Sequence, residues 1–226
     1  MPAPRVLVLQ HHPLEHPGVF AVTLGRYGAR LEVVRSFAGE HCPPTLAAYD
    51  GLIVMGGPMS VDDHDAHPWL HDERALVAEA IAADTPTLGV CLGSQLIASV
   101  AGAPVAPGPA PEIGWYRIDP TPHAAHDPLF GDVAPFVALE WHRDAFPLPA
   151  GAVPLASSAQ YPVQAFRLGR RVYGLLFHVE VDDDLVGSWC DAFADGRRDL
   201  GGDAVPDIAA ANRLAVTIAE RLFLSR

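Results

Sequence analysis

Cys91 is the residue whose surroundings point most directly to covalent chemistry. It lies between Gly89 and Gly93, after a short apolar run and before apolar residues at helical spacing. A strand, a sharp turn and a helix form the setting of a nucleophile elbow, where glycines allow close backbone approach. The positive end of the following helix favours the thiolate, which is the reactive form of cysteine. A single cysteine can also be an inert buried residue, but the flanking glycines favour a nucleophile.

His178 and Glu180 could supply the base and the acid that such a nucleophile requires. They follow a predicted strand over Arg171–Phe177, and residues i and i+2 of a strand share a face. The carboxylate of Glu180 can then orient the imidazole of His178. We therefore predict that Cys91, His178 and Glu180 form a catalytic triad.

Gly56 and Gly57 end a predicted strand over Tyr49–Met55 and precede Pro58. Paired glycines at a strand end leave backbone N–H groups free to point into a cleft, as an oxyanion hole requires. Any tight turn can use Gly-Gly-Pro, so this motif is weak evidence by itself.

Strands and helices are expected to alternate around these residues, which is typical of an α/β fold with a parallel sheet. The remaining predicted strands are Arg5–Gln10, Leu31–Val34, a buried strand from Pro86 to the elbow, Glu112–Ile118, Val137–Trp141 and Val163–Leu168. The predicted helices are Phe20–Tyr27, one from about Trp69, one after Cys91, a short one over Asp127–Phe130, Asp183–Ala194 and Pro206–Phe223. A Pro/Ala/Gly connector is expected over Ala103–Pro111, and a small antiparallel hairpin around Gly169.

Composition limits the class of protein. The 226 residues are 50% hydrophobic and 19% charged, which favours a single α/β domain over residues 1–226. The net charge of −12 argues against a nucleic-acid-binding surface. The three cysteines show no metal or disulfide spacing, and no apolar run fits a secretory signal or a membrane span. We therefore expect a soluble, cytoplasmic protein with neither nucleic-acid nor membrane partners.

Two histidine-rich loops invite a metal-site interpretation. The first holds His11, His12 and His16, and the second is the run Asp62–His71. Prolines interrupt both clusters, and no cysteine accompanies the first. We therefore expect polar loops at both places, and neither a metal nor another cofactor.

The elbow sequence Gly89–Gln95 resembles the nucleophile motif of class I glutamine amidotransferases, most closely that of their stand-alone, GMP-synthase-like members. Gly56–Val61 is similar to the family's oxyanion strand, which implies that the backbone N–H groups of Gly57 and Leu92 bind the oxyanion. Further matches are the Gln-His, Glu and Pro-Gly of residues 10–18, Glu112–Trp115 and Trp141–Asp144. The resemblance covers essentially the whole chain and implies a flavodoxin-like open, mostly parallel sheet with helices on both faces.

The resemblance also implies a reaction, in which Cys91 attacks the side-chain amide of glutamine and forms a γ-glutamyl thioester. It places Gln95 at the bound substrate, and the segment of His142, Arg143 and Asp144 at the amino-acid end of that substrate. The sequence contains no synthetase domain, so a separate synthetase subunit is one candidate for the ammonia acceptor, which the sequence does not identify.

Three alternatives stay open. The same chemistry could act on γ-glutamyl peptides or γ-glutamyl amines with no acceptor, because a fold does not set its substrate. A cysteine α/β-hydrolase would use the order Cys91, Asp144, His178. The third is a non-catalytic, amidotransferase-like binding protein, since Arg143 replaces a family glycine and Val179 replaces the proline of a His-Pro-Glu pattern. Such a protein would serve as the binding subunit of a larger assembly.

Arg143 bears on the choice among these alternatives. Pointing into the pocket, its guanidinium would hold a carboxylate and suit a γ-glutamyl peptide or acid. Pointing outward, it would be one more solvated charge.

Overall fold

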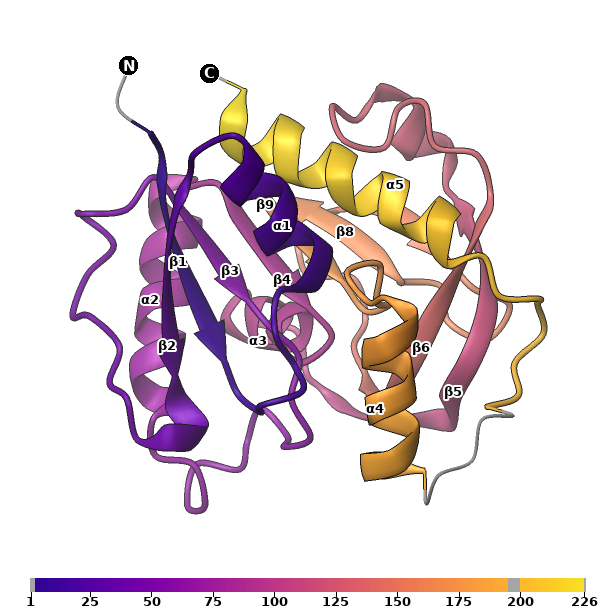
Figure 1. Ribbon diagram of the computed structural model, residues 1–226, viewed down its shortest axis with the longest axis horizontal. Coiled ribbons are helices and arrows are strands. Elements are labelled where there is room, and N and C mark those ends of the chain that lie inside the picture. Colours follow the sequence, from indigo (N-terminus) through magenta and orange to yellow (C-terminus); the bar gives the residue numbers. More distant parts are fainter. Residues whose placement is uncertain (1–2, 195–199, 226) are drawn as a thin grey trace.

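The computed structural model describes residues 3–194 and 200–225. Within them, nine strands form one sheet in the order β2-β1-β3-β4-β9-β8-β7-β5-β6 (Figure 1). The strands are β1 Arg5–Gln10, β2 Arg30–Arg35, β3 Gly51–Val54, β4 Thr87–Val90, β5 Ala106–Pro120, β6 Phe136–Ala145, β7 Val153–Ser157, β8 Ala165–Leu168 and β9 Val172–Leu175. The helices are α1 Gly18–Arg26, α2 Leu70–Ala83, α3 Leu92–Val100, α4 Asp183–Phe193 and α5 Ile208–Ala219, which continues as a π-helical turn over Glu220–Leu224.

One half of the sheet is parallel and buried on both faces. Strands β2, β1, β3, β4 and β9 pair in parallel. In β1, Val6 and Val8 belong to the core beneath α1 and α5, whereas Leu7 and Leu9 belong to the core beneath α2 and α3. Figure 1 shows these two helix pairs on opposite faces of the sheet. The near-continuous apolar strands follow from this double burial, and the predicted α/β architecture is confirmed.

The other half of the sheet is antiparallel and larger than the sequence indicates. The hairpin of β8 and β9 around Gly169 is present as predicted, but β7 and β5 extend it, and β6 closes the edge. The predicted connector Ala103–Pro111 is wrong from Ala106 onward, because β5 begins there. Its prolines are tolerated since the pairing with β6 is interrupted by a register shift between Pro107 and Glu112.

The short helix predicted over Asp127–Phe130 is also wrong. A 3-10 helix occupies Pro122–His126 instead. The carboxylate of Asp127 accepts hydrogen bonds from the backbone N–H groups of Leu129 and Phe130, which makes these residues a side-chain-stabilised turn.

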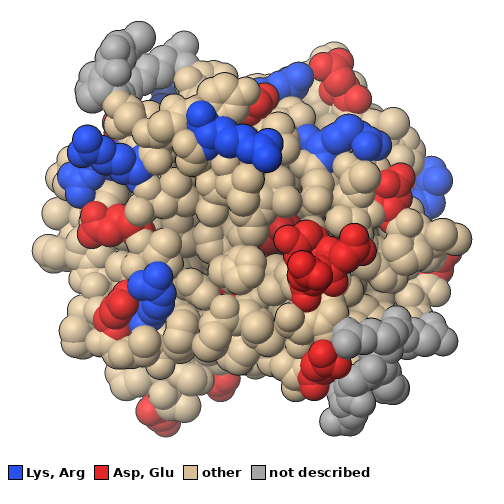
Figure 2. Space-filling view, viewed as in Figure 1, with Lys and Arg blue, Asp and Glu red and all other residues tan. Residues whose placement is uncertain are grey.

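Charged side chains are distributed unevenly over the surface. On the face shown in Figure 2, basic side chains are separated from one another, and one larger acidic cluster lies right of the centre.

No helix in the described part of the chain has the length and apolarity needed to cross a membrane.

Candidate active site

Cys91 lies at a strained turn between β4 and α3. Its φ of +49° is in the left-handed region that residues with a side chain rarely adopt. A Cβ on Gly93 would lie 2.0 Å from the carbonyl oxygen of Val54, and one on Gly89 would lie 2.5 Å from the backbone of Gly93. Both glycines are therefore required for α3 to pack directly on the sheet, which confirms the predicted strand–turn–helix geometry.

The imidazole of His178 and the carboxylate of Glu180 form a buried pair. His178 Nδ1 lies 2.7 Å from Glu180 Oε1, and the backbone N–H of Val179 donates to Glu180 Oε2 at 3.0 Å. Burial opposes protonation, but the charge of Glu180 and the hydrogen bonds with Cys91 and Glu180 raise the pKa of His178 well above its usual value. The structure thus brings Cys91, His178 and Glu180 together.

The segment that carries this pair follows β9 rather than belonging to it, which corrects the predicted strand. Its position depends on neighbouring elements. The backbone N–H of His178 donates to the carbonyl of Leu139 in β6 at 2.8 Å. The side-chain amide of Asn212, in α5, donates to the carbonyls of Val179 and Val181 at 2.9 and 2.8 Å. Helix α5 therefore holds both ends of the segment, and the adjacency of the pair does not come from strand geometry alone.

Aromatic side chains cover the same pair. The rings of Trp189, in α4, and His178 are perpendicular, with centroids 4.7 Å apart. Trp141 and Phe193 extend this aromatic group toward solvent. The wall excludes water from one side of the imidazole, which strengthens its electrostatic interaction with the carboxylate.

His11 is tied to the Gly56–Gly57 turn. Its Nδ1 lies 3.0 Å from the carbonyl oxygen of Gly56, and its Nε2 lies 2.8 Å from a carboxylate oxygen of Glu73. Burial opposes the charged ring, whereas the charge and the hydrogen bond of Glu73 raise the pKa of His11. In a planar trans peptide the carbonyl of Gly56 and the N–H of Gly57 point in opposite directions. The N–H of Gly57 therefore points away from His11, and no backbone carbonyl of the described residues accepts from it.

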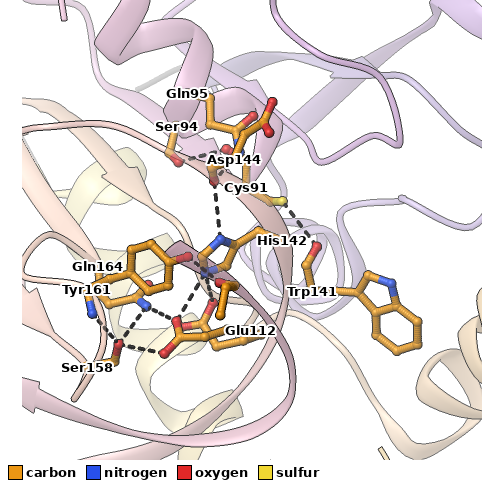
Figure 3. A network of polar contacts seen from close by, with 12 residues as sticks. Cys91, Ser94, Gln95, Glu112, Trp141, His142, Asp144, Ser158, Tyr161 and Gln164 are labelled. Carbon is orange, nitrogen blue, oxygen red and sulfur yellow. Dashed lines mark hydrogen bonds and ion pairs between the residues drawn. The ribbon is translucent and has the colours of Figure 1, made fainter. Parts of the chain in front are cut away.

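A cavity of about 480 Å³ opens beside Cys91. It is lined by Glu15, Gly57, Pro58, Met59, Ser60, Asp63, Cys91, Gln95, Ile113, Trp141, His142, Arg143, Asp144 and Phe193. The Sγ of Cys91 lies 3.9 Å from the backbone carbonyl of Trp141, and the side-chain amide of Gln95 donates to the carbonyl of Asp144 at 3.1 Å (Figure 3). Arg143 is exposed at the rim. The predicted substrate-binding residues therefore lie around one cavity.

His142 also lines this cavity, and its side chain is fully buried. Its Nε2 lies 3.2 Å from Glu112 Oε2 and 3.3 Å from Glu140 Oε2, and its Nδ1 lies 3.2 Å from the carbonyl oxygen of Asp144. The side chains of Ser158 and Gln164 complete the hydrogen bonding of Glu112 (Figure 3). Burial opposes the imidazolium, but hydrogen bonds to Glu112 and Glu140 raise the pKa of His142 to about 10. A charged His142 thus offsets one of the two buried carboxylates.

His142 and its two carboxylate neighbours form the candidate metal site among the described residues. Glu112, Glu140 and His142 each offer one ligand atom, and these atoms lie within 4.8 Å of one another. A divalent cation would have to displace the proton on His142 Nε2, and the raised pKa favours that proton. In the first histidine-rich loop, the side chain of His11 is buried and its Nε2 contacts the carboxylate of Glu73.

The profile of the family described as glutamine amidotransferase class-I matches residues 20–187. The chain belongs to the class I glutamine amidotransferase family.

Relatives of the chain span amidotransferase-like proteins and GMP synthases. A glutamine amidotransferase-like protein of Salmonella typhimurium, YfeJ, is 34% identical over 180 residues, which cover 78% of this chain and 75% of that protein. The GMP synthase of Aeropyrum pernix is 30% identical over 215 residues, covering 86% of this chain but 40% of that enzyme.

Solved structures agree with this membership. The glutamine amidotransferase of Methylobacillus flagellatus has a TM-score of 0.89 at 30% identity, with 99% of this chain and 96% of that chain covered. The glutamine amidotransferase of Thermotoga maritima has a TM-score of 0.86 at 26% identity, with 99% of both chains covered. The expected flavodoxin-like class I amidotransferase fold is therefore confirmed.

Three polar residues around the site are not identified by reasoning from the sequence. Glu73, in α2, reads as an acid near a helix N-terminus, yet it is fully buried against His11. Glu140 is a fully buried acid within the apolar run of β6, and this placement is the signal that could reveal it. Glu15 lines the cavity, although in the sequence it is only part of a loop pattern. In this amidotransferase, polar groups to which the sequence assigns no role thus contribute to the cavity and its support.

Proposed function

We propose that this amidotransferase hydrolyses the side-chain amide of glutamine to glutamate and ammonia, with Cys91 as nucleophile, His178 as acid–base and Glu180 as the orienting acid. The observation that carries the proposal is the 2.7 Å contact between His178 Nδ1 and Glu180, because it leaves the other ring nitrogen for Cys91. The carboxylate beside His178 is that of Glu180, so the geometry supports this triad over the order Cys91, Asp144, His178.

The reaction would proceed in two halves through a thioester. The Cys91 thiolate attacks the amide carbon, and the resulting oxyanion is bound by the N–H groups of Gly57 and Leu92. His178 protonates the departing nitrogen, which leaves a γ-glutamyl thioester on Cys91. His178 then takes a proton from water, the hydroxide attacks the thioester, and glutamate is released.

His11 supports the proposed oxyanion donor. By binding the carbonyl of Gly56 it keeps the N–H of Gly57 turned away from the His11 ring, and Gly57 lines the same cavity as Cys91. Leu92 is the first residue of α3, so its N–H has no partner within the helix. Both donors are thereby fixed before substrate arrives, which is the condition for electrostatic stabilisation of the oxyanion.

The amino-acid end of glutamine would lie between Gln95 and the end of β6. Gln95 and His142 both contact the carbonyl of Asp144, which fixes the backbone there. Arg143 is exposed at the cavity rim, where its guanidinium can reach an acidic group of a substrate larger than glutamine. This observation favours a γ-glutamyl peptide as the second candidate substrate.

The acceptor that we propose for the ammonia is a separate synthetase subunit. Relatives from Sulfurisphaera tokodaii and Halobacterium salinarum are each named as one subunit of a glutamine-hydrolysing GMP synthase, and the former is 32% identical over 60% of this chain. This chain spans 40% of the Aeropyrum pernix GMP synthase. A hydrolase of γ-glutamyl peptides would need no such partner.

Covalent labelling followed by turnover tests the proposal. A diazo-ketone analogue of glutamine should label Cys91 and spare Cys42 and Cys190. Cys190 is buried, and burial with the nearby charges of Glu73 and Asp72 raises the pKa of Cys42 to about 12.

Turnover of glutamine and of a γ-glutamyl peptide panel, with ammonia detection, then assigns the substrate. Equal labelling of all three cysteines would contradict the proposed nucleophile. Selective labelling without turnover of any compound would favour the non-catalytic binding protein.

A further inference from the structure

Glu15 is a carboxyl group in the cavity that the proposed mechanism does not use. It follows β1, lines the cavity together with Cys91, and is only 9% exposed. Its Oε2 is buried and has no hydrogen-bond partner among the described residues. Leaving a buried carboxyl oxygen unpaired costs stability, so a ligand that donates a hydrogen bond there would recover that loss.

The position of Glu15 in the cavity indicates which part of the substrate its carboxyl group would contact. A Cβ built on Gly56 would lie 2.4 Å from Glu15 Oε2 and 3.3 Å from the Cε1 of His178, so the two side chains converge on one point. His178 is the proposed proton donor to the departing nitrogen. In the proposed mechanism Gly57 binds the oxyanion, and Gln95 lies at the amino-acid end of glutamine. The unpaired oxygen therefore lies near the imidazole that would protonate the departing nitrogen.

Burial and the charges of the neighbouring histidines act on the protonation of Glu15 in opposite directions. Burial raises the pKa of Glu15 to about 7, the charges of His178 and His11 lower it, and the charge of Glu180 raises it. Near neutral pH the carboxyl group is therefore present in both protonation states. A cation beside it would favour the carboxylate, because opposite charges at short range stabilise the ionised form.

We propose that Glu15 forms a subsite for the leaving amine, which accepts an N–H of the scissile amide and retains the departing nitrogen as an ammonium ion. This inference rests on the proposed amide hydrolysis. When the C–N bond breaks, its electron pair stays on nitrogen, which takes one proton from His178. The ammonia then takes the proton of the Glu15 carboxyl group, and the ammonium pairs with the carboxylate until it leaves. The substrate class is therefore an amide of ammonia or of a primary amine, since an ester offers no N–H.

Matched substrates with nitrogen and oxygen leaving groups test this subsite in the full-length protein. Glutamine and the γ-methyl ester of glutamate differ at the leaving group alone. For Glu15→Gln we expect kcat/KM for glutamine to fall by about 10- to 100-fold, and that for the ester to change by less than about 3-fold. Asp63→Asn removes a second carboxylate of the same cavity and should keep the wild-type ratio of the two substrates. An equal fall on both substrates, or no fall on either, would overturn the subsite.

Stability separates a functional role of Glu15 from a structural one. Because Oε2 is unpaired, Glu15→Gln and the apolar Glu15→Leu should each keep or raise the melting temperature. Glu15→Leu should show the same selective loss on glutamine, so the inference does not depend on one variant. A clear drop in melting temperature in both variants would indicate that Glu15 is structural.

A binding measurement keeps the inference distinguishable from the proposed reaction. In Cys91→Ala protein, about 100 mM methylammonium should raise the melting temperature more than tetramethylammonium, which has no N–H to donate. Glu15→Gln in that background should abolish the difference. If the wild type hydrolyses neither substrate but this difference is present, the reaction is wrong and the subsite holds. The subsite alone is wrong if turnover is normal and Glu15→Gln changes neither the ratio of kcat/KM for glutamine and the ester nor the difference in melting temperature between methylammonium and tetramethylammonium.

Discussion

His178 and His142 lie on two sides of Cys91 and share most of their chemistry. Both are buried, both contact carboxylates, and the nearby charge of Cys91 contributes to the raised pKa of each ring. They differ in how many ring nitrogens are occupied. Glu180 occupies one nitrogen of His178, whereas two carboxylates and the carbonyl of Asp144 occupy both nitrogens of His142. A buried histidine can exchange protons with a nucleophile only where one nitrogen is left free, so we assign catalysis to His178 and support of the cavity wall to His142.

Replacing each histidine by asparagine gives the largest expected contrast. His178→Asn should lower kcat/KM for glutamine by about 10⁴-fold, because the base is removed, and it leaves one buried carboxylate, that of Glu180, without its partner. His142→Asn should instead lower the free energy of unfolding by about 3–5 kcal/mol, since it leaves two buried carboxylates without their cation. Steady-state kinetics and chemical denaturation of both variants measure the two effects. A larger catalytic loss in stably folded His142→Asn would reverse the assignment.

The acid partner of His178 gives the next largest effect. Glu180→Gln should lower kcat by about 10³-fold, because the imidazolium loses its stabilising charge. Asp144→Asn is the control, since Asp144 contacts His142 and Gln95 through its backbone carbonyl, which the substitution keeps. It should cost less than about 10-fold in kcat. If Asp144→Asn were the more damaging change, the cysteine-hydrolase order would replace the proposed triad.

The pH dependence of stability tests the His142 side of the comparison. The pKa of His142 is raised to about 10 in the folded protein from about 6.5 in an unfolded chain. Its contribution is therefore complete below about pH 6.5 and is lost as the pH rises through about 10. The melting temperature should fall over this interval by on the order of 5 °C or more.

A His142→Gln variant is the control for that decline. His178 and His11 also have raised pKa values and contribute a loss of the same sign. The wild-type decline should therefore be steeper than that of His142→Gln, and the difference belongs to His142. Parallel curves for the two proteins would show that His142 is not charged in the folded state.

Arg143 gives the smallest expected effect, because its side chain is exposed at the rim of the wall that His142 supports. Arg143→Gly should raise KM for a γ-glutamyl peptide by about 3- to 10-fold and leave KM for glutamine within about 2-fold. Kinetics on both substrates measure this change. An unchanged ranking of the two substrates would remove the residue-level support for the peptide candidate.

The surroundings of His178 and of His142 also differ in how well they can be predicted from the sequence. His178 and Glu180 are two residues apart, and Cys91 lies in a local strand–turn–helix pattern, so short motifs suffice to predict that the three residues come together. The wall around His142 depends on Glu112, 30 residues away, and on the register that pairs β5 with β6. No local pattern encodes that register.

The same distinction holds for the elements of the fold. The apolar parallel strands are predicted well, because burial on both faces produces continuous apolar runs. Strand β7 is not predicted, since its sequence contains a proline and only five residues. The start of β5 is not predicted either, because prolines and a glycine there are typical of a connector. Neither strand is an edge strand, but each is paired on one side only where these prolines lie: Pro154 pairs with β8 alone, and Pro107 with β6 alone. Prolines are tolerated where one side of a strand is unpaired, and this weakens the sequence signal.

The two hydrogen bonds from Asn212 to the carbonyls of Val179 and Val181 have a consequence for the order in which the protein matures on the ribosome. Cys91 is synthesised early, although its backbone N–H pairs with the carbonyl of Leu175 in β9, and the segment of His178 and Glu180 acquires its clamp only when α5 emerges. At about 5–20 residues per second, translation from Cys91 to Asn212 takes roughly 6–24 s. Throughout that interval the nascent chain carries the thiol of Cys91 without a positioned base. The protein is therefore expected to become active only after α5 has emerged.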